Sequence, residues 1–334
     1  MTSTPLAAVV LAAGLGTRMR SRRPKHLHPL LGRPLVDWTL AAVRALGPEP
    51  LVVVTSPATL ADFEATLASG ELVAVQETPR GTGDAAAAAR HLLRDFGGDV
   101  LVVAGDAPLL TSAVLADLVE AHRRERAGVT VLSFEPDEPG SYGRIVRDDA
   151  GRLRAVVEAA DASPAELAIR EANSSTYVFA SGDLWPALER LAPDNAQGEL
   201  YLTDAVRHLV DDGRRASVYR ASDPLVGEGV NTRADLAAAG ARLRDEILRR
   251  HMEAGVTIVD PATTWIEADV AIEPDAVVHP FTVLRGRTIV REAAEVGPHV
   301  VAVDAEIGRG ALVGPFCYLR PGTVLEPGAK AGTF

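Results

Sequence analysis

Near the N-terminus the chain reads Leu11-Ala12-Ala13-Gly14-Leu15-Gly16-Thr17-Arg18-Met19, and Pro24-Lys25 follows five residues later. Small residues at positions 12 to 14 allow the backbone to approach a base or a ribose, while Gly16 and Thr17 direct amide N–H groups toward phosphate oxygens. Arg18 supplies a fixed positive charge and Lys25 a mobile one. The stretch therefore predicts a loop that binds a nucleotide.

This loop differs from two common phosphate-binding motifs. Met19 stands where the Rossmann fingerprint has its third glycine, and the Gly-x-x-x-x-Gly-Lys-Ser/Thr pattern of the P-loop is missing. A glycine-rich turn by itself is commonly a structural hairpin. Arg18, Pro24 and Lys25 in the expected register favour phosphate binding instead.

The surrounding sequence alternates short aliphatic runs with helical stretches up to about residue 134. The runs are Ala7–Leu11, Leu51–Val54, Leu72–Val75, Val100–Val103 and Val129–Leu132. The helical stretches are Val36–Leu46, Thr59–Leu67, Asp84–Phe96 and Ser112–Glu125. This alternation predicts an α/β fold with a mostly parallel sheet flanked by helices. Ligands bind at the carboxyl edge of such sheets, so the loops after Leu11, Val75 and Val103 are the informative ones.

Residues 135 to 230 mix shorter strands with two more helices. The strands are expected at Gly143–Val146, Ala155–Glu158 and Thr176–Ala180, and the helices near 183–192 and 203–211. We expect this segment to extend the same domain, residues 1–231, and to close over the sheet edge. A linker helix is predicted over 232–254, because one face carries the apolar residues Leu236, Ala239, Leu243, Ile247 and Leu248 and Gly255 follows as a cap.

After Gly255 the apolar period changes to six. The repeating positions are Ile266, Ile272, Val278, Leu284, Val290 and Val296 and, after a slip of one residue, Ile307, Val313, Leu319, Leu325 and Ala331. A helical period of 3.6 cannot produce this spacing, which predicts a parallel β-helix over 255–334. The pattern runs to Phe334 without a polar capping segment, so we expect an abbreviated C-terminus.

Composition fits a globular protein of one large and one smaller domain. Of 334 residues, 47% are apolar and 24% charged. The single cysteine, Cys317, excludes an internal disulfide and has no zinc-ligand spacing around it, so a reducing compartment is expected. The apolar run Leu6–Ala13 is too short for a membrane span and lacks the flanks of a targeting signal, which predicts a cytoplasmic protein.

Charge restricts the partners. A net charge of −11 argues against nucleic acid or an anionic membrane as a partner. Against this background, basic residues crowd into one short segment, namely Arg18, Arg20, Arg22, Arg23 and Lys25. On charge alone, this segment is either a local anion site or a solvated basic loop.

Further motifs follow the loop in a characteristic order. They are Gln76 with Gly81-Thr82-Gly83, Gly105-Asp106-Ala107-Pro108-Leu109, Tyr142-Gly143-Arg144-Ile145, Glu158, Asn173, Asn195-Ala196-Gln197-Gly198-Glu199, Tyr201-Leu202-Thr203-Asp204 and Gly229-Val230-Asn231. With the loop and the hexapeptide pattern, they resemble the sugar-1-phosphate nucleotidyltransferases. More specifically, essentially the whole chain resembles the bacterial bifunctional N-acetylglucosamine-1-phosphate uridyltransferases/glucosamine-1-phosphate acetyltransferases, truncated within their C-terminal hexapeptide-repeat domain.

The resemblance implies uridylyl transfer from UTP to N-acetylglucosamine 1-phosphate, giving UDP-N-acetylglucosamine and pyrophosphate for peptidoglycan synthesis. It implies nucleotide binding by Leu11, Ala12, Ala13, Gly14, Gln76, Gly81 and Thr82. It implies sugar binding around Ala104, Gly105, Gly143, Glu158, Asn173, Tyr201 and Thr203. It assigns Mg²⁺ to Asp106 and Asn231, a charged and a neutral oxygen ligand. Taken alone, Asp106 could cap a helix and Asn231 could be the N-cap of the linker helix.

Three departures from the family pattern surround the sugar. Ala104 replaces a usual tyrosine, Ala159-Ala160 replace polar and basic residues, and Ser174-Ser175 replace Thr-Gly. They leave open a related enzyme with another sugar or base, such as a glucose 1-phosphate thymidylyl- or adenylyltransferase. An inactive β-helical scaffold is a further alternative, but the intact set Arg18, Lys25, Asp106 and Asn231 argues against it.

The expected reaction needs no general base, because a sugar 1-phosphate is largely a dianion at neutral pH. Its barrier is the repulsion between two polyanions, which positioning, Mg²⁺ and fixed cations can lower. We assign the catalytic contacts to Arg18, on the leaving pyrophosphate, and Lys25, on the reacting phosphate.

The resemblance also bears on the C-terminal coils. Arg320 matches one residue of the family's acetyltransferase site, whereas the others lie in later coils, so no acetyltransferase activity is expected. Family members associate through these coils, which implies a homotrimer.

Overall fold

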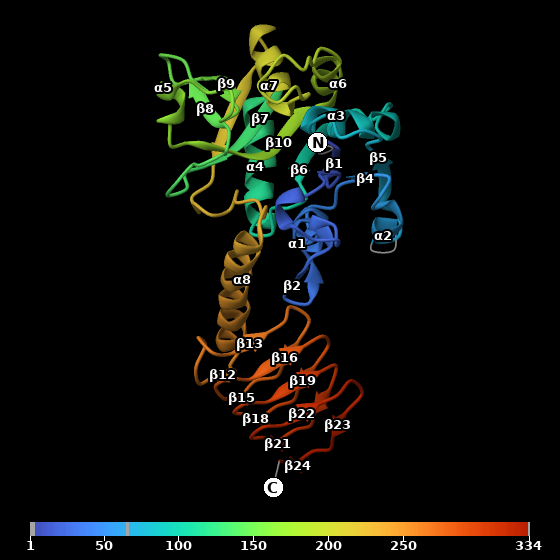
Figure 1. Cartoon of the computed structure of the whole chain (residues 1–334), viewed down its shortest axis with the longest axis vertical. Helices are drawn as coiled ribbons and strands as arrows, with labels where there is room; N and C mark the ends of the chain where they lie inside the picture. Colours follow the sequence, from blue (N-terminus) through green and yellow to red (C-terminus); the bar gives the residue numbers. More distant parts are fainter. Residues whose placement is uncertain (1–3, 65–66, 333–334) are drawn as a thin grey trace. The chain divides into compact units, whose positions relative to one another are not determined.

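The computed structural model describes residues 4–64 and 67–332 (Figure 1). The chain forms two compact units. The first contains the chain up to His28 together with Leu35–Arg233, and the second contains Pro29–Pro34 and the chain from Ala234 onward. The sequence pattern did not indicate that residues 29–34 group with the C-terminal unit. Within the described residues, none of the helices combines the length and the apolar composition that a membrane span requires.

The first unit is built on a nine-stranded, mostly parallel sheet. Its strands are β1 (Leu6–Leu11), β4 (Leu51–Thr55), β5 (Leu72–Val75), β6 (Asp99–Ala104), β7 (Val129–Phe134), β8 (Arg144–Arg147), β9 (Leu153–Val157), β10 (Ala172–Ala180) and β11 (Ala216–Arg220). The order is β11-β7-β10-β6-β1-β4-β5, and the β8–β9 hairpin attaches to β10. The five aliphatic runs correspond to β1, β4, β5, β6 and β7, and four of them form the parallel set β6-β1-β4-β5.

Strand β10 is the main difference from the expected arrangement. It lies antiparallel between β6 and β7, inside the sheet, whereas we expected residues 135 to 230 to close over its edge. Its side chains are buried along most of its length on both faces. A strand that is buried on both faces in this way suits the middle of a sheet, where helices cover both sides.

Two groups of helices cover the sheet (Figure 1). Residues of α3 (Thr82–Ala88), η3 (Ala89–Leu92), α6 (Ser181–Glu189) and α7 (Leu202–Asp211) pack on one face. The other face is covered by α1 (Leu35–Arg44), α2 (Leu60–Glu64) and α4 (Ser112–Glu125). The short elements are η1 (Thr17–Met19), η2 (Lys25–Leu27) and α5 (Pro164–Leu167). Positions 65 and 66 of the helix predicted over Thr59–Leu67 lie outside the described residues.

The second unit is built mainly on a left-handed β-helix. It contains the hairpin β2 (Pro29–Leu30) and β3 (Arg33–Pro34) and most of α8 (Arg233–Glu253). The strands of the β-helix are β12 (Thr257–Ile258), β13 (Trp265–Ile266), β14 (Ala271–Ile272), β15 (Val277–Val278), β16 (Val283–Arg285), β17 (Ile289–Val290), β18 (Glu295–Val296), β19 (Val301–Val303), β20 (Glu306–Ile307), β21 (Leu312–Val313), β22 (Tyr318–Leu319), β23 (Val324–Leu325) and β24 (Lys330–Ala331).

These strands stack into three parallel sheets, as the hexapeptide pattern predicted (Figure 1). The slip in the pattern is visible as a change of register. Trp265 pairs with Val283, whereas Ile289 pairs with Glu306, one residue closer in sequence. Ala302 fills the interior position between Val296 and Ile307 and is fully buried. The apolar column therefore continues through the slip.

We expect Ser175→Gly to stabilise the protein. The register of β10 shifts between Asn173 and Tyr177, and Ser175 lies in this bulge with φ of 58°. An L-residue in the left-handed region costs roughly 1–2 kcal/mol, and glycine avoids this cost while losing some backbone entropy. The free energy of unfolding, measured by urea denaturation, should rise by about 0.5–1 kcal/mol.

Ser174→Gly is the matched control. The Ser174 hydroxyl is buried and donates to the carbonyl oxygen of Leu132 at 2.9 Å, so its removal should lower stability. A Ser175→Gly variant no more stable than the parent protein would contradict the proposed backbone strain.

Candidate functional site

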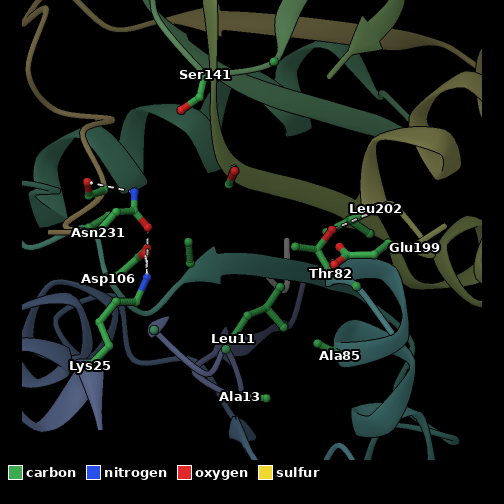
Figure 2. Close-up of a pocket in the computed structure, with 18 of the residues that line it drawn as sticks. Leu11, Ala13, Lys25, Thr82, Ala85, Asp106, Ser141, Glu199, Leu202 and Asn231 are labelled. Carbon is green, nitrogen blue, oxygen red and sulfur yellow. Dashed lines mark hydrogen bonds and ion pairs between the residues drawn. The ribbon is translucent and has the colours of Figure 1, made fainter. Parts of the chain in front are cut away.

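A cavity of about 610 Å³ opens in the first unit, where β1, β5 and β6 end. The predicted residues that line it are Leu11, Ala13, Gly14, Arg18, Lys25, Gln76, Gly81, Thr82, Ala104, Asp106, Gly143, Glu158, Asn173 and Asn231. Figure 2 shows Lys25, Asp106 and Asn231 on one side and Thr82, Ala85, Glu199 and Leu202 on the other, with Leu11 and Ala13 between them. The cavity thus has a charged end and an end formed by α3 and the segment before α7.

The other predicted residues lie behind the cavity wall. Ala12 is buried, and the backbone N–H of Gly105 donates to the carbonyl oxygen of Leu11 at 2.8 Å. Tyr201 and Thr203 are buried, and Thr203 Oγ1 donates to Glu158 Oε1 at 3.1 Å. In this structure these four residues can therefore support the lining residues.

The charged end is a compact cluster around the Lys25 ammonium. Lys25 Nζ forms an ion pair with Asp106 Oδ2 and donates to Asn231 Oδ1 at 3.2 Å. Arg18 Nη2 donates to the same Asn231 oxygen at 2.9 Å. Two cations and two oxygen-bearing side chains therefore meet at the end of β6.

Burial and charge set the ionisation of this cluster. Burial alone would raise the pKa of Asp106, but the neighbouring Lys25 ammonium outweighs it and holds the pKa below its ordinary value. Burial and the Lys25 charge lower the pKa of His26 to about 4. At neutral pH, Asp106 is therefore a carboxylate and His26 an uncharged imidazole.

Lysine is rare in this chain, and Lys25 is one of two. Lys25 and Lys330 are the two lysines among its 34 basic residues, the others being arginines.

The glycine-rich loop packs closely against Lys25, because a Cβ at Gly16 would lie 2.4 Å from the Lys25 Cβ, and Gly16 has φ of 60°. The Gly16 position thus requires glycine for both space and backbone conformation.

The Gln76 amide group is already held by the protein. Its Nε2 donates to the carbonyl oxygen of Gly81 at 3.1 Å and to Asp84 Oδ2 at 2.8 Å. Turning the amide over would place its oxygen against two acceptors, so the observed orientation is the favourable one. Gln76 therefore offers a ligand its carbonyl oxygen, a narrower role than a combined donor and acceptor.

The loop at Gly81 and Thr82 packs against the segment before α7. Gly81 has φ of 112°, and a Cβ there would lie 2.6 Å from the carbonyl oxygen of Leu200. Thr82 Oγ1 accepts from the backbone N–H of Leu202 at 3.0 Å, as drawn in Figure 2. These contacts fix the N-terminus of α3 at the cavity.

The predicted sugar residues surround an acidic region. Asn173 Nδ2 donates to the Tyr177 hydroxyl at 2.7 Å, and its backbone N–H donates to the carbonyl oxygen of Gly143 at 2.9 Å. Burial raises the pKa of Glu158, with the carboxylates of Asp204, Asp161 and Glu199 acting in the same direction and the Thr203 hydrogen bond opposing them. Without a ligand, the Glu158 charge is thus poorly stabilised.

We expect Glu158→Gln to stabilise the ligand-free protein at neutral pH. The folded state raises the pKa of Glu158 above 4.5, so ionisation lowers stability as the pH rises from 4.5 through the folded-state pKa, and the cost is complete above it. Below pH 4.5 the carboxyl is protonated in both states, and the stability difference between variant and parent should vanish. Thermal unfolding at acid and neutral pH measures this. A variant less stable at neutral pH would mean that the ionised side chain has compensating partners.

Sequence reasoning missed several cavity residues. They are His26, Ser141, Tyr177 and Gly227, together with Tyr142, Glu199, Leu202 and Gly229, which lie in the motifs quoted above but received no role there. The Tyr142 hydroxyl accepts from the backbone N–H of Gly229 at 3.1 Å, and its ring packs edge-on against Phe134 with centroids 5.1 Å apart. Gly227 also contacts Phe134, because a Cβ there would lie 2.5 Å from the ring. The motifs containing Tyr142 and Gly229 were identified, but the contact between these two residues depends on the fold.

Comparisons with known proteins identify relatives that match most of this chain. The bifunctional protein GlmU of Thermobifida fusca is 46% identical over 316 residues, which cover 93% of this chain and 65% of that protein. The bifunctional protein GlmU of Mycolicibacterium gilvum is 46% identical over 312 residues, covering 91% and 63%. That of Kineococcus radiotolerans is 45% identical over 318 residues, covering 93% and 64%. The chain thus spans slightly less than two thirds of the length of these relatives.

A family model for the MobA-like NTP transferase domain matches residues 8–212. This range is more than half of the chain. It contains the glycine-rich loop, Asp106 and most of the cavity lining described above. The chain belongs to the MobA-like NTP transferase family.

Proposed function

We propose that the first unit transfers the uridylyl group of UTP to N-acetylglucosamine 1-phosphate and releases pyrophosphate, supplying a peptidoglycan precursor. The main supporting observation is the cluster of Lys25, Arg18, Asp106 and Asn231 at one end of the cavity, with Gln76 and Glu158 elsewhere on its wall. Cations beside a carboxylate and an amide oxygen suit a metal-assisted reaction between two phosphates. The order of motifs that resembles the uridyltransferases supports this base and this sugar.

The residues present fit a divalent cation such as Mg²⁺. Asp106 Oδ2 and Asn231 Oδ1 already face one positive charge, the Lys25 ammonium. A carboxylate and an amide oxygen are the hard ligands that Mg²⁺ prefers, and substrate phosphates commonly complete its shell. Within the described residues, no group of three or more His, Cys, Asp or Glu side chains could hold a metal. Bound there by Asp106 and Asn231, Mg²⁺ would neutralise charge on the triphosphate.

The side chains would act by holding charge in place. Lys25 contacts the reacting phosphate, and Arg18 stabilises the charge that develops on the leaving pyrophosphate. The sugar phosphate oxygen attacks the α-phosphorus directly, so no covalent enzyme intermediate forms. His26 is uncharged at neutral pH and is not required as a base.

Recognition of the base would rest on Gln76. Its carbonyl oxygen can accept a hydrogen bond from a ring N–H, which uracil has at N3 and cytosine lacks. The Gly81 backbone lies beside the Gln76 amide and lines the same part of the cavity. Selection of UTP over CTP therefore follows from the contacts of one amide group.

The test is a pyrophosphate-release assay with the purified chain, four nucleoside triphosphates and several sugar 1-phosphates. We expect the fastest turnover with UTP and N-acetylglucosamine 1-phosphate, and only with a divalent metal present. Faster turnover with dTTP or ATP and glucose 1-phosphate would assign the chain to a related transferase. No turnover with any pair would refute enzymatic function.

We expect Ala104→Tyr to tighten the binding of N-acetylglucosamine 1-phosphate. Ala104 lines the cavity at the end of β6, where the family pattern has a tyrosine, so the parent protein lacks one wall and one hydroxyl there. One added apolar contact or hydrogen bond is worth about 1 kcal/mol, or roughly fivefold in affinity. Calorimetric titration measures this change. Equal or weaker binding would indicate that other side chains close the pocket.

We also propose that three copies associate through the β-helix. Its outer surface carries exposed apolar side chains, including Leu312, Tyr318 and Val324 on β21, β22 and β23. Burial of such residues between copies would stabilise an assembly. Light scattering that shows only monomers at micromolar concentration would contradict the trimer without affecting the catalytic proposal.

A further inference from the structure

The Asn231 amide group is held on both of its sides within the first unit. Its Oδ1 accepts from Lys25 Nζ at 3.2 Å and from Arg18 Nη2 at 2.9 Å. Its Nδ2 donates to the carbonyl oxygen of Gly229 at 3.3 Å. Figure 2 shows the amide oxygen turned toward Lys25 and Asp106 and the nitrogen turned away from them. The Gly229 carbonyl therefore helps to direct the oxygen of this amide, and not its nitrogen, to the charged end of the cavity.

The peptide group of Gly229 is in turn held by Tyr142. The Gly229 N–H donates to the Tyr142 hydroxyl at 3.1 Å. The Tyr142 ring packs edge-on against Phe134, and a Cβ at Gly227 would lie 2.5 Å from the same Phe134 ring. One aromatic ring thus supports both the tyrosine and the segment before Asn231, and the hydroxyl joins the two.

The loop that carries Tyr142 is fixed by a buried arginine at the start of β8. Arg144 is 3% exposed, and its guanidinium donates to the carbonyl oxygens of Tyr142 and, at 3.1 Å, Gly140. The backbone N–H of Tyr142 also donates to the carbonyl oxygen of Pro139 at 3.0 Å. A buried guanidinium is costly unless it makes hydrogen bonds, so Arg144 favours this one loop conformation. The position of the Tyr142 hydroxyl is therefore set before any substrate binds.

We propose that Tyr142 is a positioning residue for Asn231 and acts through the peptide group of Gly229. This inference rests on the proposed role of Asn231 as a metal ligand. In the proposed reaction Lys25 and Arg18 contact the substrate phosphates, and the Gly229 carbonyl still orients the Asn231 amide. Groups that orient a metal ligand commonly change metal affinity by about 10–100-fold when they are lost.

The backbone next to Asn231 has one further support, which limits the expected effect. The N–H of Val230 donates to the carbonyl oxygen of Asp106 at 2.8 Å. Loss of the Tyr142 hydroxyl should therefore loosen the Asn231 amide while the segment stays in place.

Two other roles for Tyr142 predict different results. The residue lines the cavity beside Gly143, so its hydroxyl could contact the sugar directly. That role would raise KM for the sugar phosphate and leave Asn231 unchanged in the ligand-free protein. A purely structural role would lower the unfolding temperature and change neither the Asn231 amide nor the metal requirement.

The first experiment observes the Asn231 amide in the ligand-free Tyr142→Phe variant, which keeps the ring and loses the hydroxyl. The chain has three asparagines, Asn173, Asn195 and Asn231, so ¹⁵N-asparagine labelling gives few side-chain NMR signals. Asn231→Asp identifies the signal of interest, and Asn195, whose Nδ2 donates to the carbonyl oxygen of Glu199 at 2.6 Å, is the internal reference. Exchange of the Asn231 amide hydrogens with water should become at least threefold faster relative to Asn195. Unchanged exchange would overturn the inference.

The second experiment measures pyrophosphate release against Mg²⁺ concentration. Tyr142→Phe should raise the concentration for half-maximal rate at least threefold, with KM for N-acetylglucosamine 1-phosphate changed less than twofold. The matched control is Tyr219→Phe on the edge strand β11, where the hydroxyl donates to Asp117 Oδ2 at 3.0 Å. This variant should leave both values unchanged.

The outcomes separate the positioning role from the proposed function. An unchanged magnesium requirement in Tyr142→Phe, or a rise in the sugar KM alone, would overturn the positioning role. If the parent protein releases no pyrophosphate while the Asn231 amide responds as described, the proposed function fails and the positioning of Asn231 by Tyr142 stands.

Discussion

Lys25→Ala is expected to lower kcat by roughly two to four orders of magnitude, as when a transition-state charge contact worth several kcal/mol is removed. The Lys25 ammonium is buried at the charged end of the cavity, between Asp106 and Asn231. Lys25→Arg should fail as well, because the side-chain stem is packed against Gly16 and a planar guanidinium cannot take the place of a compact ammonium between Asp106 and Asn231. Steady-state kinetics of pyrophosphate release measures both variants.

The control is Lys330→Ala, which removes the chain's other lysine in the second unit and should leave kcat unchanged. Arg18→Ala should show a similar loss to Lys25→Ala, because Arg18 contacts the same Asn231 oxygen. A Lys25→Ala variant in which only KM changes would show that Lys25 binds substrate equally in the ground state and the transition state. Its assignment as a catalytic residue would then be wrong.

Residue spacing predicted the parts of the fold that are locally encoded. The helix expected over Ser112–Glu125 has those bounds in the structure, because Thr111 caps it by accepting from the backbone N–H of Val114. The β-helix followed from its period, since each interior position repeats at a fixed interval. Both signals depend on neighbouring residues in the sequence and need no knowledge of the tertiary structure.

Long-range placement could not be predicted in the same way. Nothing in the sequence of Ala172–Ala180 indicates that β10 lies between β6 and β7, because its four polar residues, 173–176, are followed by an apolar end that suits any buried strand. The hairpin Pro29–Pro34 is similarly short, and its partners Ala268 and Asp269 are far away in sequence. The candidate site likewise combines residues that sequence motifs reveal with an arrangement that only the fold determines. The motifs containing Lys25, Asp106 and Asn231 were recognisable, but their convergence on one ammonium required the fold.

Asp106→Ala should reduce kcat by about three orders of magnitude or more, because metal assistance is worth several kcal/mol. The carboxylate is the charged member of the proposed Mg²⁺ ligand pair, and Lys25 keeps its pKa below 3.8, so it is ionised throughout the neutral range. Asp106→Asn keeps the shape and a neutral oxygen, so it separates loss of charge from loss of a ligand. Titration with Mn²⁺, followed by electron paramagnetic resonance, reports metal binding independently of turnover.

Stability provides the second part of this test. Removing Asp106 leaves the Lys25 ammonium, with a side-chain exposure of 9%, facing the Asn231 oxygen alone. An ion pair that loses one partner in a buried site is destabilised by a few kcal/mol, and an open cavity reduces this cost because water can enter. Asp106→Ala should therefore lower the unfolding temperature while the protein stays folded, and Lys25→Ala in the same chain should recover part of the loss. If Asp106→Ala instead kept both its turnover in the presence of EDTA and its unfolding temperature, then neither the metal assignment nor the Lys25 pairing could be correct.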